Sequence, residues 1–493
     1  MPTSCATCSC VSWRRARAAQ KASALVALAD DALARSDVQG AERHFIEAAA
    51  QDAGPELLAR LRSRAGDVRD EARLITALVA RAEQLGRPHA AAWEALGRLE
   101  IESLGEAREG VAHLNRALAL SPGRPDTIAA LARGLVALGK HDDASARLVA
   151  LVTKEPPAIL GVSDVGSALA ALETALREQG RRDESVVARE LRALAGALDD
   201  GAHVELRARR SPLFDAPAGA LDVQRAAAAL LPDDARTMVF ALTSALAGVD
   251  AKLCRSDLES LDVNPRQRIT SPNVHPLAAM LAWVARLFGI DTPPLVFSPR
   301  IATSRVLSVD GDAWVALPST LAGRPEPEQL ASVARAALRI ALAVAWIDEV
   351  PSDEALPLVL GIARRVVPGY GQDDADRADD WSERVGRAVG RKQKKALAEL
   401  ERRLQSERAP TVAEVLAFRR GVAQAEARAA FVLSGDLLAT LDALRAGDSA
   451  LSQRTEAFGP AALGAVLTHP IGADLVRFAL GASASTLRTR LGG

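Results

Sequence analysis

Histidine and cysteine are the residues of this chain that could bind a metal ion, and their spacing decides whether they do. A catalytic zinc site needs three protein ligands, and two of them commonly lie four residues apart on one helix face. No histidine of the chain is three or four residues from another. The histidines are His44, His89, His113, His141, His203, His275 and His469. We therefore expect no metal site.

Three of the four cysteines cluster at the N-terminus, as Cys5, Cys8 and Cys10. A closed zinc site needs a fourth ligand, and no second Cys or His pair lies nearby, so the role of this cluster stays open. The fourth, Cys254, follows Lys252 and precedes Arg255, and basic neighbours can lower the pKa of a thiol. We interpret Cys254 as a small buried thiol, with a reactive thiol as the alternative.

Other catalytic patterns are also missing from the sequence. It contains no glycine-rich phosphate loop ending in Gly-Lys, no Gly-x-Gly-x-x-Gly turn after a strand and no Gly-x-Ser-x-Gly nucleophile turn. The acidic run from Asp373 to Asp380 lacks the spacing of a calcium loop, and we interpret it as a solvated loop. We expect no catalytic residue and no cofactor.

Charge and hydropathy argue against nucleic-acid and membrane partners. The formal net charge is −1, and the basic run Arg391–Lys395 is flanked by acidic residues, which favours a solvated helix face. The most apolar stretch, Val333–Ile347, is shorter than a membrane span and carries Arg335 and Arg339. With four cysteines in 493 residues and no export signal, we expect a reducing compartment, the cytoplasm.

The elements that would position any site are mostly helices, because Ala, Leu and Arg dominate and aromatic residues make up only 3%. The first part of the chain is repetitive. The pattern Gly110-x3-Leu114-x2-Ala117-x4-Pro122 recurs 34 residues later as Ala144-x3-Leu148-x2-Leu151-x4-Pro156. A small residue suits a close helix crossing, and proline ends the second helix. One such hairpin cannot bury its apolar face alone, so the units must stack.

This pattern resembles the tetratricopeptide repeat over residues 22–197, most faithfully in Gly97–Pro122 and Leu131–Pro156. The unit that starts at Trp93 has one extra residue between its helices, and Glu56–Ala80 departs from the pattern. The resemblance implies a protein or peptide partner in a groove lined by the first helices. Arg98 and Arg133 occupy groove positions and could pair with ligand carboxylates, the alternative being ordinary solvent-exposed arginines.

The second part of the chain contains the only convincing strands. Pro294–Ser298 is apolar and bounded by proline, and Arg305–Val309 and Ala313–Leu317 are joined by Asp310-Gly311-Asp312, which is typical of a hairpin turn. A long helix is predicted next, over Pro327–Ile347.

This order of elements resembles the core of zinc metallopeptidases of the M48 type over residues 270–440. The resemblance puts the two zinc-binding histidines at Ala336 and Ile340 and the catalytic glutamate at Ala337. It puts the third ligand and a supporting aspartate at Ala423 and Ala427, while Glu426 projects from another angle of that helix. All of these family residues are absent, so the resemblance implies a domain without zinc. A generic α+β domain is the alternative.

We thus predict a mostly α-helical protein, with a disordered tail over 1–20, a tetratricopeptide-like solenoid over 21–197, a linker over 198–221 and a helical α+β domain with a small antiparallel sheet or hairpin over 222–493. The predicted function is a non-catalytic scaffold or adaptor that binds a protein partner through its repeats. The alternatives are a hydrolase or other enzyme with an unrecognised site in the second domain, and a structural subunit of a larger assembly. The partner and the oligomeric state stay open.

Overall fold

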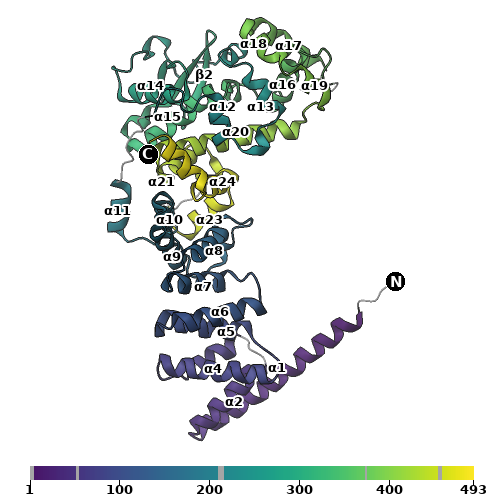
Figure 1. Cartoon of the computed structure of the whole chain (residues 1–493), viewed down its shortest axis with the longest axis vertical. Coiled ribbons are helices and arrows are strands. Elements are labelled where there is room, and N and C mark those ends of the chain that lie inside the picture. Colours follow the sequence, from purple (N-terminus) through teal and green to yellow (C-terminus); the bar gives the residue numbers. More distant parts are fainter. Residues whose placement is uncertain (1–4, 52–54, 209–215, 372–374, 453–457, 493) are drawn as a thin grey trace. The chain divides into compact units, whose positions relative to one another are not determined.

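The chain folds into two compact units, residues 1–192 and 193–493, in a computed structural model. The structure describes residues 5–51, 55–208, 216–371, 375–452 and 458–492. Each unit is described by itself below, with the element labels of Figure 1.

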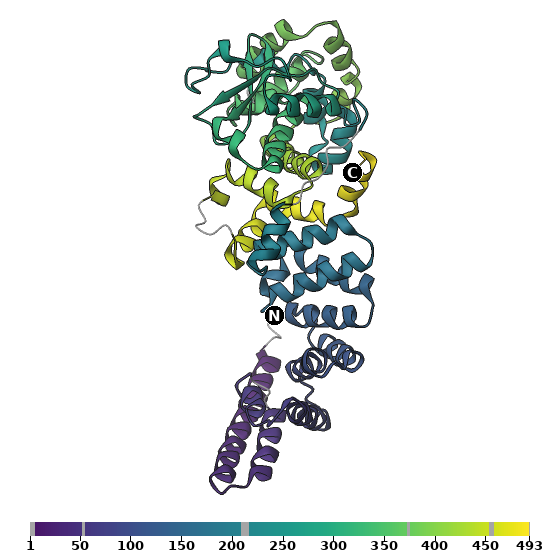
Figure 2. The same ribbon diagram turned by 90° about the vertical axis from the view of Figure 1, so that its left-hand side faces the viewer.

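The first unit consists of antiparallel helices joined by short turns (Figure 1). The bounds of these helices are α1 Cys5–Ala34, α2 Val38–Gln51, α3 Pro55–Arg62, α4 Val68–Gln84, α5 Ala90–Leu99, η1 Glu100–Leu104, α6 Ala107–Leu120, α7 Pro125–Ala137, α8 His141–Thr153, η2 Ala158–Gly161, α9 Val165–Glu178 and α10 Arg182–Leu194. From α4 to α9 each helix packs on the next, so the hairpins form a stack, which Figure 2 shows from the side. The predicted helical solenoid is confirmed.

Two glycines allow a close helix crossing in this stack. A Cβ atom on Gly97 of α5 would lie 2.7 Å from the carbonyl oxygen of Gly110 of α6, and the reverse contact is equally short. Any side chain here would force the two backbones apart, as the repeat pattern predicts. At the corresponding crossing of α7 and α8, Ala132 and Ala144 are fully buried.

The extra residue in the unit that starts at Trp93 is absorbed by a turn of π-helix. The helix α5 continues without a break into η1, and the left-handed Gly105, with φ of 73°, ends it. A π turn accommodates one additional residue in a helix without unwinding its neighbours. The insertion therefore lengthens and rotates the end of the first helix, which carries Glu100 and Glu102.

The N-terminal part of the first unit differs from its prediction. Helix α1 begins at Cys5, inside the segment 1–20 that the sequence analysis describes as a disordered tail. Its Arg- and Ala-rich sequence has high helix propensity, which a search for repeats does not weigh. The segment Glu56–Ala80, which departs from the repeat pattern, forms α3 and α4. Leu61, Leu74 and Ile75 from these helices are fully buried in one core with Phe45.

The second unit is mainly helical around one small sheet. Its helices are α11 Asp200–Ala208, which lies in the predicted linker, α12 Val223–Leu230, η3 Asp233–Ala235, α13 Met238–Ser244, η4 Asp250–Leu253, η5 Pro265–Gln267, α14 Pro276–Phe288, η6 Ser319–Gly323, α15 Glu326–Ala341, η7 Ala345–Asp348, α16 Ala355–Arg364, α17 Ala375–Ala388, α18 Arg391–Ala398, α19 Glu401–Ser406, α20 Val412–Ser434, α21 Leu437–Arg445, α22 Ser449–Ser452, α23 Pro460–Thr468, α24 Pro470–Ala479 and α25 Ala482–Arg490.

The sheet has three strands in the order β1-β3-β2. The predicted hairpin is confirmed as β2 Arg305–Val309 and β3 Asp312–Pro318, which pair antiparallel. The first strand, β1 Leu295–Ser298, adds to the other edge of β3 in the parallel direction, so the sheet is mixed rather than antiparallel. One face buries Leu307 and Trp314 in a small cluster, and α15 packs against β2 and β3.

Helices α15 and α20 form the centre of the second unit, and they pack against each other extensively. Helix α20 begins with a capping box in which Thr411 and Glu414 exchange hydrogen bonds, and it ends at the left-handed Gly435. From Leu330 to Arg339 every residue of α15 is buried. These two helices position the polar residues described below.

The Gly97–Gly110 crossing gives a first prediction. Replacing Gly97 with valine should destabilise the α5–α6 hairpin by about 1–3 kcal/mol, because the nearest facing atom is the backbone carbonyl oxygen of Gly110, which cannot move aside. Hydrogen–deuterium exchange of the full chain should show faster exchange in α5 and α6. Gly66→Ala is the matched control, since no atom lies within 4 Å of its Cβ position. Equal exchange in both variants would contradict the close crossing.

Candidate functional site

The predicted groove residues Arg98 and Arg133 meet on one carboxylate, that of Glu102. Arg98 lies on α5, Arg133 on α7 and Glu102 on the intervening π turn η1. Arg133 Nη2 donates to Glu102 Oε1 at 2.5 Å, and Arg98 Nε lies 3.4 Å from the same oxygen. Two first helices thus direct arginines to a common point.

Arg133 is held from the next hairpin as well. Arg133 Nη1 is 4.0 Å from Asp164 Oδ2, just before α9. The pKa of Asp164 is lowered, chiefly by hydrogen bonds from Ser167 and further by the charges of Arg133 and Arg98, so it stays ionised. The Nε–H of Arg133 is buried and has no hydrogen-bond partner in the described part of the chain. One donor of this arginine is therefore unused.

A hollow of about 330 Å³ adjoins Arg98 and Glu102 in the first unit. Its wall includes Leu58 and Arg62 of α3, Ala95 of α5 and Arg124, which precedes α7. Arginines thus enter it from several hairpins. Each has a partner within the unit: Arg62 pairs with Glu71, and Arg124 lies 3.1 Å from Glu94 Oε2. A ligand must compete with these internal carboxylates.

The glutamates of the π turn are the groove residues that the sequence analysis missed. Glu102 is 37% exposed, whereas Glu100 is buried and accepts a hydrogen bond from His113 Nδ1 at 2.6 Å. Burial raises the pKa of Glu100, while the contact with His113 opposes that rise. The extra residue between the two helices is the sequence signal that could have revealed these glutamates, because an insertion on a groove helix redirects the side chains after it.

In the second unit, the positions that the peptidase resemblance assigns do not form a site. Ala336 and Ala337 are buried in α15, but Ile340 is partly exposed. On α20, Ala427 is buried and Ala423 is partly exposed. The residues that face each other between the helices are instead Arg335 and Arg339 of α15 and Glu426 of α20. The side chain of Glu426 points to α15.

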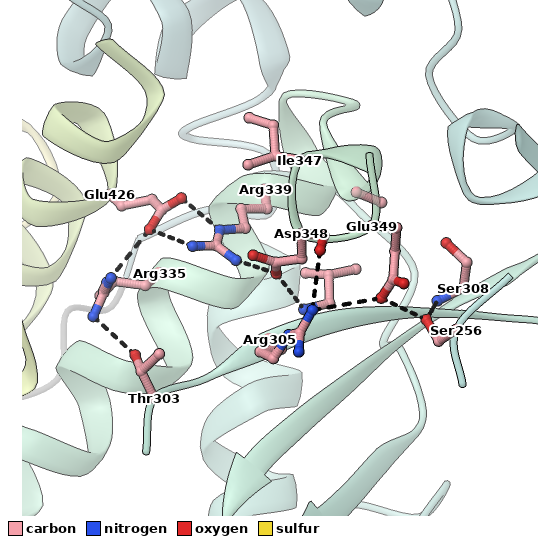
Figure 3. Close-up of polar contacts among 12 residues, drawn as sticks. Ser256, Thr303, Arg305, Ser308, Arg335, Arg339, Ile347, Asp348, Glu349 and Glu426 are labelled. Carbon is pink, nitrogen blue, oxygen red and sulfur yellow. Dashed lines mark hydrogen bonds and ion pairs between the residues drawn. The ribbon is translucent and has the colours of Figure 1, made fainter. Parts of the chain in front are cut away.

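These three residues form a buried ion cluster, which Figure 3 shows. Glu426 is 1% exposed; it accepts from Arg339 Nε at 2.5 Å and from Arg339 Nη2 at 3.0 Å. Arg335 Nε lies 3.4 Å from Glu426 Oε2, too poorly aligned for a hydrogen bond. Arg335 Nη1 donates instead to Thr303 and to the carbonyl of Ala443. The carboxylate is thus enclosed by two guanidinium groups four residues apart.

The cluster continues to the edge of the sheet (Figure 3). The carboxylate of Asp348 in η7 accepts a hydrogen bond from Arg339 Nη1. The backbone carbonyl of Asp348 accepts a hydrogen bond of 3.0 Å from Arg305 Nη2. Arg305 Nη2 also lies 3.9 Å from Glu349, which accepts from Ser256 Oγ at 2.8 Å. A chain of polar contacts therefore links α20 through α15 and η7 to β2.

The electrostatics of the two arginines differ. Desolvation lowers the pKa of Arg335, and Glu426 compensates only in part. Desolvation also acts on Arg339, but Glu426 and Asp348 outweigh it and raise its pKa. Both stay protonated at neutral pH, because a guanidinium pKa lies far above 7. The cluster can hold charge and position helices, and guanidinium groups are not metal ligands.

The remaining residues of interest are scattered. Cys254 is partly buried rather than fully buried, and desolvation raises the pKa of its thiol to about 12. The side chains of Cys5, Cys8 and Cys10 and the residues Asp373 and Asp374 lie outside the described residues. The basic run Arg391–Lys395 lies at the start of α18, and its cationic side chains are exposed. No group of three or more potential metal ligands occurs among the described residues, and none of their helices is long and apolar enough for a membrane span.

One further carboxylate is buried against η7, the element that carries Asp348 of the ion cluster. Asp250 of η4 is 5% exposed and accepts from the backbone N–H of Ala345 at 3.0 Å. Desolvation raises its pKa to about 6.

The ion cluster gives a second prediction. Glu426→Gln should destabilise the second unit by about 3–5 kcal/mol, because the buried Arg335 loses its counter-charge and Arg339 keeps only that of Asp348. Urea unfolding followed by tryptophan fluorescence measures it, since Trp283, Trp314, Trp346 and Trp381 all lie in this unit. Exposed Glu399→Gln is the control. The triple variant Arg335→Met, Arg339→Met and Glu426→Met should restore much of the lost stability. A loss below about 1 kcal/mol in Glu426→Gln would contradict the role of Glu426 as a buried counter-charge.

Asp250 gives a third prediction, on pH. Its folded pKa is raised, so its contribution to stability is full below about pH 4 and is lost as pH rises through about 6. Relative to Asp250→Asn, the parent should lose on the order of 3 kcal/mol between pH 4 and pH 7. Urea unfolding over this range measures the difference, with exposed Asp291→Asn as control. A difference that is independent of pH would show that Asp250 titrates normally.

Comparison with known proteins yields little. No family model and no curated protein matches the chain. Among solved structures, the crystal structure of MamA protein is similar at 21% identity and a TM-score of 0.26, over 35% of this chain and 89% of that one. The peptidase resemblance finds no support in these comparisons, and the helical-repeat fold is established by the arrangement of the hairpins.

Proposed function

We propose that the protein is a non-catalytic interaction scaffold and that its first unit binds an acidic segment of a protein partner. The observation that carries this proposal is the convergence of Arg98 and Arg133 on Glu102. Arginines from two successive hairpins share one exposed carboxylate, and the hollow beside them has room for a side chain. Guanidinium groups bind carboxylates with two parallel hydrogen bonds, which favours an Asp, a Glu or a chain terminus as ligand.

Glu102 acts as an internal substitute for that ligand. It is 37% exposed, and a surface ion pair contributes only about 0–1 kcal/mol, so a partner's carboxylate can displace it at little cost. An incoming carboxylate would take the place of Glu102 on Arg133 Nη2, because the Nε–H of Arg133 is buried. The ion pairs also hold the arginine side chains in place before binding, which reduces the entropy lost on association.

We propose further that the second unit has no peptidase activity. The aligned histidine positions, Ala336 and Ile340, carry no metal ligand, and the arginines that precede them, Arg335 and Arg339, pair with Glu426. This arrangement stabilises the helix pair without an open coordination position, which metal catalysis requires. A hydrolase with another site is the competing function.

A photo-crosslinking experiment on the full chain tests the scaffold function. A photo-reactive amino acid at Ala95, in the wall of the hollow, should capture a partner in cells. Arg98→Ala combined with Arg133→Ala should lower the yield of that adduct at least tenfold. Glu102→Gln should raise it, because the internal competitor loses its charge.

The matched control removes two arginines from the second helices of the same hairpins. Arg108 on α6 and Arg147 on α8 are exposed and form no ion pair among the described residues. Arg108→Ala combined with Arg147→Ala changes the net charge equally and should leave the yield within twofold. Equal losses in both double variants would contradict recognition by the groove arginines, and hydrolysis of a captured partner would favour the enzyme alternative.

A further inference from the structure

The second unit contains a cavity of about 710 Å³ that none of the functions above uses. Lys252, Cys254 and Arg255 lie on one wall, Glu349 and Pro351 on another, and α17 on the third. Its volume is within the range of sites that bind a whole small molecule.

The wall that α17 provides is one continuous helix face. Arg377, Trp381, Arg384 and Arg387 follow each other at spacings of four, three and three residues, and Asp380 lies four residues before Arg384, so these side chains share one side of the helix. The packing of α17 against η4 and α16 fixes this face relative to the opposite wall.

The charges that line the cavity do not cancel. Of its carboxylates, Glu349 accepts from Ser256, and Glu354 accepts from both Arg377 and Trp381 Nε1. Four cations have no ion-pair partner among the described residues, namely Lys252, Arg255, Arg384 and Arg387. The lining contains one further negative charge, the carboxylate of the exposed Asp380. The cavity therefore carries an excess of positive charge that its own walls leave unneutralised.

One of these cations is held in place without a carboxylate. The guanidinium of Arg384 lies 4.7 Å from the centre of the Trp381 ring, and the ring is fixed by the hydrogen bond of 2.9 Å from its Nε1 to Glu354. A cation above an aromatic face is positioned by the ring, and its N–H donors stay available for a ligand. Arg384 is therefore oriented for an anion that the protein itself does not supply.

We propose that this cavity binds a small molecule with two or more linked phosphate groups. Several separated cations on two walls require more than one negative charge on the ligand, and arginine pairs well with phosphate oxygens. Linked phosphates supply these charges within a few ångströms. Asp380 would repel a long polyanion that covers the helix face, which favours a compact ligand over nucleic acid. The proposal is independent of the partner groove, because all of its residues belong to the second unit.

Titration calorimetry of the full chain with inorganic pyrophosphate, and separately with ATP, tests the proposal. We expect saturable binding of one ligand for each chain. Arg384→Gln combined with Arg387→Gln should weaken it at least tenfold, because each charged hydrogen bond contributes more than a tenfold factor. Lys252→Gln, on the opposite wall, should also weaken binding. All three side chains are exposed, so the fold should persist.

The matched control is Arg402→Gln combined with Arg420→Gln. Both residues are exposed, form no ion pair among the described residues and lie outside the cavity lining. This variant has the same net charge as the cavity variant and should bind within twofold of the parent. Equal weakening in both double variants, an absence of saturation, or tighter binding of a single-stranded oligonucleotide than of pyrophosphate and ATP would each overturn the proposal.

Discussion

The second unit depends on how one buried negative charge is compensated. Glu426 lies between α15 and α20, and both arginines that enclose it come from α15. A buried carboxylate is costly unless its counter-charges are close and well placed, so these contacts fix the rotation and register of the two helices. Since Arg339 also contacts Asp348, the same charge determines where η7 joins the sheet. The residue after Asp348, Glu349, lines the large cavity.

The first unit depends on a steric constraint instead. Gly97 and Gly110 let α5 and α6 approach until their backbones touch, and the chain then adds one residue at η1. The added residue turns Glu100 inward, to His113, and Glu102 outward, to the arginines. The close crossing and the insertion are neighbours in the chain, and the inserted turn carries the carboxylate of Glu102 that contacts Arg98 and Arg133.

The sequence predicts those parts of the fold that depend on local patterns. The hairpins from Gly97 to Pro156 follow from spacing and small residues, and the β2–β3 hairpin follows from its Asp-Gly-Asp turn. The contact face of α15 could not be predicted, because the residues that face Glu426 are Arg335 and Arg339, and a pattern of apolar residues assigns arginines to the solvent side. The alignment on Ala336 and Ile340 is therefore one residue away from Arg335 and Arg339. The parallel pairing of β1 and the partners of Glu102 are long-range contacts, which local patterns do not encode.

The stacking of hairpins in the first unit has an evolutionary consequence. Each hairpin packs mainly on its immediate neighbours, so a change in one is felt only by the next. The insertion at η1 illustrates this, since the units on either side keep their own helix crossings. Such an array can acquire a new ligand preference by altering the end of a single helix, while selection on the remaining hairpins continues to preserve their packing.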